Sequence, residues 1–463
     1  MDAGPLPSKS ASGGVRQLVE LAWPIVLSRA TQSVIGFCDA LMLAPLGETA
    51  LAAGSTGALN AFAWIILPMG TVFILQSFSA QLRGRGDVDA IPRFGWYGLV
   101  LAAAAGALAL AMIPALPWLF GVFDYEPGVE RLMLEYMSIR LLSVAPAVGT
   151  EAIGNWYGGL GNTRIAMVAG LVSMVTNVVG NYVLIEPRLG LPGWGVTGAA
   201  WASVLATVLG FLVVITLFLR GVGYEKPSGI PRLRVAELLR VVRFGLPNGV
   251  NWFLEFAAFM LFVNVVVAHL GTTVLAALNV VMQINSIAFM PAFGLSSAGA
   301  ILVGEAIGRR AHDEVWPIVR RTAAIALGWM GAVAVSYALA PEFFFSWFGP
   351  KNAPDGGEAL MAVGATMLVL SSTWQLFDAT AMTFGEALRA AGDTTWCMAA
   401  RIVLAWLVFT PVGWAAVFLL DGGVVAVMVS MAGYMGLLAL ALAARFASGR
   451  WRTIDLVGEP SLV

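Results

Sequence analysis

Long apolar runs separated by short polar loops make up most of the chain. The hydrocarbon core of a bilayer is crossed by about 20 residues of α-helix, and a helix satisfies its own backbone hydrogen bonds there. Twelve runs of this length occur, and the pattern predicts an all-α polytopic membrane protein. The predicted spans cover residues 18–44, 50–79, 92–118, 129–152, 164–185, 196–219, 241–268, 275–303, 316–340, 358–384, 396–419 and 424–446.

Lysine and arginine gather on one side of the predicted membrane. With twelve spans, the N-terminus, the even-to-odd loops and the C-terminus share one side, which holds 21 of the 26 basic residues. The other side holds Arg131, Arg188 and Lys351, while Arg29 and Arg140 lie within spans. Cytoplasmic loops retain positive charge, so both termini are predicted to be cytoplasmic.

The two halves of the sequence resemble each other. Residues 46–53 read Leu-Gly-Glu-Thr-Ala-Leu-Ala-Ala, and 224 residues later 270–277 read Leu-Gly-Thr-Thr-Val-Leu-Ala-Ala. Further matches keep a similar offset: Pro24 with Pro247, Pro68 with Pro291, Gly84-Arg85 with Gly308-Arg309, and Gly161-Asn162-Thr163 with Gly392-Asp393-Thr394. Six spans is an even number, so the second copy enters the membrane in the same orientation.

This parallel repeat predicts two pseudo-symmetric six-helix bundles around a central cavity, an architecture typical of transporters. The predicted parts are an N-terminal bundle at 18–219, a cytoplasmic linker at 220–240 and a C-terminal bundle at 241–446, with cytoplasmic tails at 1–17 and 447–463.

Composition narrows the function. Only 11% of the residues are charged and 59% are apolar, whereas a soluble domain carries about 25% charged residues. The net charge of −1 provides no basic field for nucleic acid. Two cysteines and two histidines give no metal-ligand spacing, and no phosphate-binding loop is present. Energy must therefore come from an ion gradient or a partner.

Among the carboxylates of the predicted spans, four are candidates for a role in the membrane: Asp39, Glu151, Glu255 and Asp378. Placing each of these side chains in the membrane costs about 2.5 to 3.5 kcal/mol, so we expect each to have a functional or structural role. Glu255 has no basic residue within two helical turns in the sequence, which makes it a candidate to exchange a proton or take Na⁺. Glu255, Asp378 and Asp39 are the candidate coupling residues, and a purely structural acid is the alternative. For Glu151, near the cytoplasmic interface, the structural role is favoured.

Polar amides support the same interpretation. Asn177 and Asn181 are four residues apart and share a helix face, and Gln283 with Asn285 precedes the proline at Pro291. Such amides can coordinate a cation or bond a polar drug, and they also join membrane helices to one another. Both alternatives stay open for these four residues.

Several segments together are typical of one transporter family: Leu21-Ala22-Trp23-Pro24, Phe37-Cys38-Asp39, Leu51-Ala52-Ala53, Phe244-Gly245-Leu246-Pro247, Glu255, Phe289-Met290-Pro291 through Val303-Gly304, Gln375-Leu376-Phe377-Asp378 and Ala387 through Thr394. On these residues the chain resembles the multidrug and toxic compound extrusion (MATE) family, and its NorM-like branch in particular. The resemblance covers roughly residues 15–450.

The resemblance implies a V-shaped cavity and secondary active export of amphipathic, mostly cationic compounds in exchange for Na⁺ or H⁺. It implies a multi-pass bacterial inner-membrane protein, acting as a monomer in the lipid bilayer, without a cofactor or resident metal. In that branch Glu255 and Asp378 form the cation site, where Na⁺ binds transiently. Asp39 matches an acid that serves proton coupling in other branches together with positions 177 and 181. Asn181 departs from members with an acid there, and Ala390 from members with Gly.

Three alternatives compete with this interpretation. A lipid-linked oligosaccharide flippase of the same superfamily needs basic residues in its cavity, and the only arginines that could serve are Arg29, Arg140 and, near the cytoplasmic start of its span, Arg401. A membrane-embedded enzyme would need a nucleophile with a base, and both histidines lie at span ends, so we expect no enzyme. A purely structural role would leave the buried carboxylates unexplained.

Overall fold

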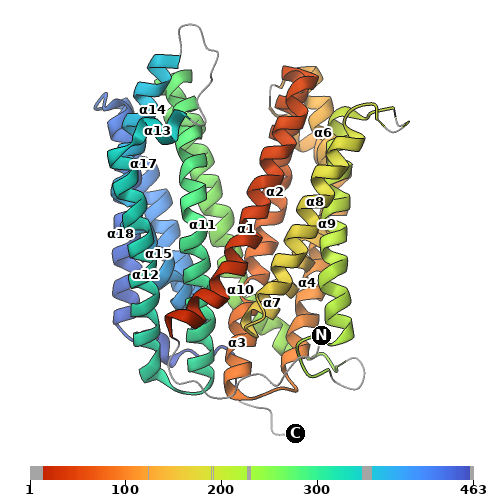
Figure 1. Ribbon diagram of the computed structural model, residues 1–463, viewed down its shortest axis with the longest axis vertical. Helices are drawn as coiled ribbons and strands as arrows, with labels where there is room; N and C mark the ends of the chain where they lie inside the picture. The colour runs from red at the N-terminus through yellow and green to blue at the C-terminus, as the bar shows by residue number, and fades with distance from the viewer. Residues whose placement is uncertain are drawn as a thin grey trace. The chain divides into compact units, whose positions relative to one another are not determined.

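The computed structural model describes residues 14–123, 125–188, 190, 192–226, 231–346 and 357–458, and every regular element in these ranges is helical (Figure 1). The α-helices of the first half are α1 (Val15–Leu43), α2 (Glu48–Val72), α3 (Leu75–Arg85), α4 (Ile91–Met112), α5 (Leu116–Phe120), α6 (Pro127–Leu141), α7 (Val144–Gly159), α8 (Arg164–Leu184) and α9 (Gly195–Arg220). Those of the second half are α10 (Val235–Leu261), α11 (Thr272–Gly308), α12 (His312–Leu339), α13 (Pro341–Ser346), α14 (Gly357–Ser371), α15 (Gln375–Ala390), α16 (Thr394–Ile402), α17 (Thr410–Phe418) and α18 (Gly423–Ala447). Lys351, residues 1–13 of the predicted N-terminal tail and residues 459–463 of the C-terminal tail lie outside the described residues.

The helices confirm the predicted spans with one modification. Eleven helical stretches are long and apolar enough to cross a bilayer, and a bent pair, α6 with α7, makes the twelfth. The two helices of this pair meet at 47°, where the sequence predicted one continuous span over 129–152. Pro146 explains the break, because it lies in the first turn of α7 and has no N–H to continue the hydrogen bonds of α6.

Contacts among the helices divide the chain into two compact units. The first contains Leu27–Gly249, and the second contains the described part of Ala11–Val26 together with Val250–Val463. Only α1 and α10 pass from one unit to the other among the described helices. Each crossing comes two residues after a proline inside the helix, Pro24 in α1 and Pro247 in α10. A proline removes a backbone hydrogen bond and weakens the helix at that level.

Glycines at equivalent positions show the internal repeat in the backbone. Gly47 and Gly271 have φ angles of 99° and 103°, and each lies between a short 3₁₀ helix and a long membrane helix. Gly161 and Gly392 have φ angles of 78° and 89°. A residue with a Cβ is strained at such angles, so the repeated Gly positions in the sequence mark repeated turns.

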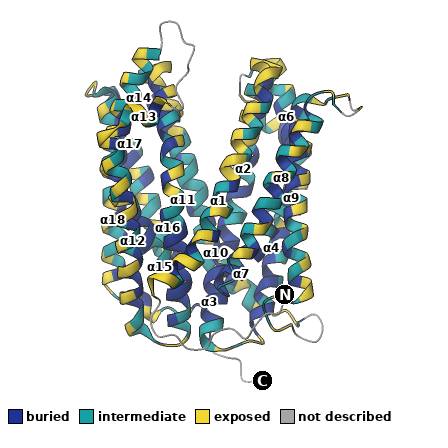
Figure 2. Ribbon diagram, in the orientation of Figure 1, coloured by how far each residue is buried: buried dark blue, intermediate teal, exposed yellow. Residues whose placement is uncertain are grey.

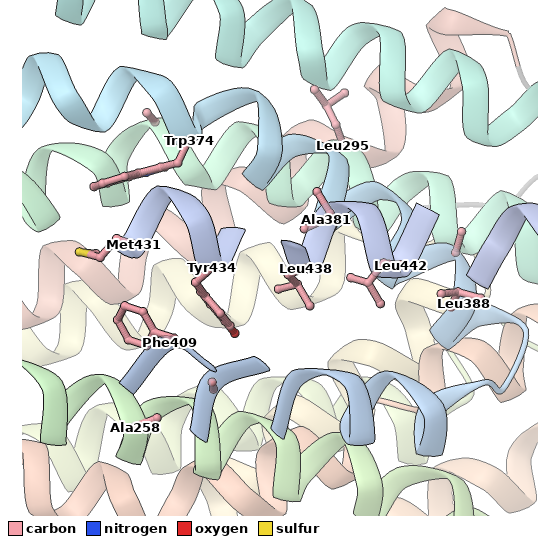
Figure 3. Close-up of a cluster of buried hydrophobic side chains, with 14 of the residues drawn as sticks. Ala258, Leu295, Trp374, Ala381, Leu388, Phe409, Met431, Tyr434, Leu438 and Leu442 are labelled. Carbon is pink, nitrogen blue, oxygen red and sulfur yellow. The ribbon is translucent and has the colours of Figure 1, made fainter. Parts of the chain in front are cut away.

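Each unit has its own packed interior. In the first unit, residues 75–82 of α3 are all buried (Figure 2). In the second unit a large apolar cluster surrounds Tyr434, which projects from α18 beside the Phe409 ring with 5.3 Å between ring centroids (Figure 3). This apolar packing holds the polar end of Tyr434 in a fixed position.

Candidate functional site

Glu255 lies in α10, and both oxygens of its carboxylate accept hydrogen bonds. The Arg401 Nη1 atom, from α16, lies 2.9 Å from Oε2 and 3.1 Å from Oε1. The Tyr434 hydroxyl, from α18, donates to Oε1 over 2.9 Å. The neighbours of Glu255 in the sequence include no basic residue, but the fold supplies one from 146 residues farther along the chain. Glu255 is therefore an ion-paired carboxylate.

Asp378 joins the same cluster from α15. It lies in the first turn of that helix, which directly continues the 3₁₀ helix Ser372–Trp374. Its carboxyl interacts electrostatically with Arg401, Glu255 and Tyr434. Within the described ranges no side chain donates a hydrogen bond to it. The structure thus brings together Glu255 and Asp378, as the sequence predicted, and adds two partners.

The charges of this C-terminal cluster do not balance. Arg401 carries one positive charge, and the carboxyl groups of Glu255 and Asp378 carry two negative charges when both are ionised. An unbalanced charge in a low-dielectric interior is costly. The cluster is therefore neutral only after it binds one further proton or monovalent cation.

Two π-helical segments flank this cluster. One, at Phe262–Val267, follows α10 and the other, at Val403–Phe409, follows α16. Their rings pack together, with 4.4 Å between the centroids of Phe262 and Phe409. The π-helix is rare and is frequently found at functional sites. In the first unit, α1 and α8 carry no such segment within their described α-helical bounds.

Asp39 forms a second cluster in the other unit. Asn181 Nδ2 donates to its Oδ1 over 2.5 Å, and the Ser203 hydroxyl donates to its Oδ2 over 3.4 Å. Asn177 completes the cluster, since its Nδ2 donates to Ser203 over 3.1 Å and its Oδ1 accepts from Asn181 over 3.2 Å. The structure therefore brings together all three residues that the sequence predicted here.

Arg140 acts on Asp39 only at longer range. Its charge interacts electrostatically with Asp39, while its Nη1 donates to Ser143 over 3.2 Å. The hydrogen-bond donors to the Asp39 carboxylate are neutral amide and hydroxyl groups. This is the main chemical difference from Glu255.

The two predicted residues of α11 have hydrogen-bond partners or exposure of their own within the second unit. Asn285 donates to the Val281 carbonyl and to Ser371, and its Oδ1 accepts from Gln375. These bonds join α11 to α14 and α15 inside the second unit, which is an interhelical role. Gln283 is exposed on α11. Neither amide contacts Glu255 or Asp378, so their assignment to a substrate site stays a prediction.

Glu151 is fully paired within the first unit. Arg29 Nη2 lies 2.5 Å from its Oε1 and Nη1 lies 3.3 Å from its Oε2, and Asn155 also donates to Oε1. This pairing agrees with a structural role for Glu151. It also accounts for Arg29, which the sequence left within a span without a partner.

Sequence reasoning did not assign Arg401, Tyr434 and Ser203 to the site. A signal existed for Arg401, because an arginine inside a span requires a counter-ion. For Ser203 and Tyr434 the sequence contained no comparable signal, since hydroxyl groups are common in membrane helices.

Comparison with known proteins places this chain among transporters. The model of the MatE family matches residues 24–183 and 247–415. A probable multidrug resistance protein NorM of Pseudomonas putida is 28% identical over 453 residues, with 96% of each chain covered. A probable multidrug resistance protein NorM of Neisseria meningitidis serogroup B is 30% identical over 390 residues, with 81% of each covered.

Solved structures share the fold. A MATE crystal structure in the bent conformation has a TM-score of 0.82 at 20% identity and covers 94% of this chain and 96% of its own. The outward-facing conformation of a multidrug resistance MATE family transporter has a TM-score of 0.86 at 19% identity and covers 95% and 97%. These likenesses confirm the predicted all-helical transporter fold.

Proposed function

Because the chain belongs to the MatE family of membrane transporters, we propose that this protein is a secondary active multidrug efflux antiporter. It exports amphipathic, mostly cationic compounds and takes up H⁺ or Na⁺ in exchange. It works in the bacterial inner membrane with both termini in the cytoplasm, as the distribution of basic residues favours. Family membership makes it a transporter and not an enzyme.

The observation that carries the proposal is a pair of separate carboxylate clusters within membrane helices. Asp39 is held by amides and a hydroxyl in one unit, and Glu255 with Asp378 faces Arg401 in the other. Ionisable residues at this depth are costly and mark ion or substrate pathways. A carboxylate that a proton or Na⁺ neutralises cannot at the same time bind an organic cation by its charge, which is the basis of exchange.

The two crossing helices support alternating access by rocking of the units. A change of access requires points at which α1 and α10 bend, and Pro24 and Pro247 lie two residues before the crossings. Proline frees a backbone carbonyl and lowers the resistance of the helix to bending.

The alternative is a lipid-linked oligosaccharide flippase of the same superfamily. Such a protein needs basic side chains available for a diphosphate. Arg29 is ion-paired with Glu151 and Arg401 with Glu255. These pairings favour the antiporter.

The test is efflux of a fluorescent organic cation from proteoliposomes under an imposed pH gradient or an imposed Na⁺ gradient. We expect at least one gradient to drive efflux. The variants Asp39→Asn and Glu255→Gln should each reduce it, because each removes a negative charge from one of the two acid clusters.

The matched control is Glu186→Gln, which removes an exposed carboxylate outside the spans and should leave efflux unchanged. If neither gradient moves the cation while the protein is folded and inserted, the antiporter proposal is wrong. Binding of a lipid-linked diphosphate by the same preparation would then support the flippase.

A further inference from the structure

The carboxylate of Glu255 is already occupied by two hydrogen-bond donors. Arg401 Nη1 reaches both oxygens, and the Tyr434 hydroxyl reaches one of them. The side chains of Glu255 and Arg401 are 31% and 21% exposed, so the pair is largely shielded from water. A guanidinium keeps its proton at any physiological pH. Glu255 therefore has a permanent cation beside it.

A metal cation and a proton place different demands on such a cluster. Hard cations are bound by several oxygen ligands at once. At Glu255 the N–H and O–H groups point at the oxygens that a cation would need, and the guanidinium repels it. A proton needs only one free lone pair, which the Asp378 carboxyl offers. Both carboxylate oxygens of Glu255 accept hydrogen bonds, whereas among the described residues no side chain donates a hydrogen bond to the Asp378 carboxyl.

On these grounds we propose that Arg401 is a built-in counter-cation that makes the C-terminal cluster bind a proton at Asp378 rather than Na⁺ at Glu255. The inference rests on the proposed antiport function, since it specifies which ion that site couples. The step is a simple protonation: one proton joins one Asp378 carboxylate oxygen, and the same O–H bond breaks when access changes.

The charged groups around Asp378 are few. Arg401 comes from α16 and Glu255 from α10, with the Tyr434 hydroxyl from α18. The helices α11 and α12 also pack against α15. Their charged and histidine residues lie in the last turn of α11 or the first three turns of α12. On α15 itself the next charged residue, Glu386, lies eight positions later, about 12 Å along the axis.

The internal repeat shows what the same position looks like without an arginine. Gly161 pairs with Gly392 at an offset of 231, and the same offset relates Gly170 to Arg401. A Cβ at Gly170 would lie only 2.8 Å from the Thr31 Oγ1 atom, so this position has no room for a long side chain. In the unit that holds Asp39, the position equivalent to Arg401 therefore supplies no arginine, and Arg140 acts on Asp39 only at longer range.

The deciding experiment measures equilibrium binding of ²²Na⁺ to the purified full-length protein in detergent. We expect the wild-type protein to show no binding that depends on Glu255. Arg401→Gln should bind ²²Na⁺ at least about tenfold more tightly than wild type, because it removes a unit positive charge and frees Glu255. The gain should disappear in Arg401→Gln with Glu255→Gln. Arg401→Lys keeps the charge and should behave like wild type.

Arg29→Gln is the matched control, since it removes the arginine of another Arg–Glu pair within a span and should give no gain in ²²Na⁺ binding. Wild-type binding that Glu255→Gln abolishes would overturn the proposal. So would a folded, monodisperse Arg401→Gln protein with no gain. If Arg401→Gln does not fold, the comparison of ²²Na⁺ binding between wild type and Glu255→Gln still tests the proposal.

A transport assay distinguishes a failure of this inference from a failure of the proposed antiport function. In proteoliposomes a pH gradient should drive efflux of the fluorescent cation by wild type, and an Na⁺ gradient should do so only in Arg401→Gln. If no gradient drives efflux by wild type, the antiport proposal fails, while ²²Na⁺ binding still tests the role of Arg401.

Discussion

The two acid clusters solve the same electrostatic problem in different ways. In the first unit Asp39 has only neutral donors within hydrogen-bonding distance, from Asn181 and Ser203. In the second unit two acids share one arginine. With their carboxyl groups ionised, each cluster has one negative charge that its hydrogen-bonded partners do not cancel. From this comparison we infer that each unit takes up one monovalent cation, and that the partners of the acids decide which cation fits.

The loss of Asp378 should have the largest effect. Asp378→Asn removes the acid that accepts the proton, so gradient-driven efflux should fall by about a hundredfold or more, the scale of a lost essential group in proton transfer. Efflux from proteoliposomes under a pH gradient measures this. Asp378→Glu should retain part of the activity. Full activity in Asp378→Asn would show that the second unit does not couple through this residue.

Breaking the ion pair should have the next largest effect, on stability. Arg401→Met leaves the partly buried Glu255 without its counter-ion, and the free energy of unfolding should fall by about 3 kcal/mol. Adding Glu255→Gln should recover much of this loss. Thermal unfolding of the four proteins in detergent gives the coupling energy. Strictly additive losses would contradict a direct interaction.

The neutral donors of Asp39 should matter less. Asn181→Ala removes the shortest hydrogen bond to Asp39 and one bond to Asn177, which should lower the free energy of unfolding by about 2 kcal/mol. The same unfolding assay measures it. Asn264→Ala is the control, since its amide is exposed and bonds only to the carbonyl one turn earlier. Equal losses in the two variants would argue against the Asp39 cluster.

The packing of α17 against the π-helix at Phe262–Val267 should give the smallest effect. A Cβ at Gly413 would lie 2.5 Å from the Phe262 ring, so Gly413→Ala should lower the free energy of unfolding by about 1 kcal/mol. At Gly433, in the interior of α18, a Cβ meets nothing within 4 Å. Gly433→Ala should therefore be neutral or slightly stabilising. A neutral Gly413→Ala would mean that the two segments pack less tightly than the contact implies.

Much of the fold follows from the sequence, because apolar runs of membrane length can be recognised directly. The span count came from these apolar runs, and the repeat with its paired glycines came from matching residues in the two halves of the sequence. The bend between α6 and α7 lies at Pro146, where a proline kink could be expected from the sequence, but its angle of 47° could not. The π-helix at Phe262–Val267 corresponds to a small difference between the two halves of the sequence. Gly47 lies 23 positions after Pro24, whereas Gly271 lies 24 positions after Pro247. One extra residue lies in the interval that contains this segment.

The acids of the site were also predictable, since a carboxylate in a span is rare and costly. Glu255 and Asp378 were assigned to one site, and the fold brings them together. An arginine within a span signals a counter-ion, but the sequence could not show that Glu255 is the partner of Arg401, because the rotation of one helix against another is not encoded in hydropathy. The same limit applies to Gln283 and Asn285, whose polarity alone could not distinguish a substrate contact from an interhelical bond.

The most direct test of the account is proton release during drug binding. A fluorescent organic cation is added to the purified protein in weakly buffered detergent solution, and a pH indicator records the protons released. The account predicts that wild type releases protons on binding and that Asp378→Asn releases fewer, because that acid no longer holds one. Binding without proton release, or release that Asp378→Asn leaves unchanged, would contradict the exchange of a cation for a proton at this cluster.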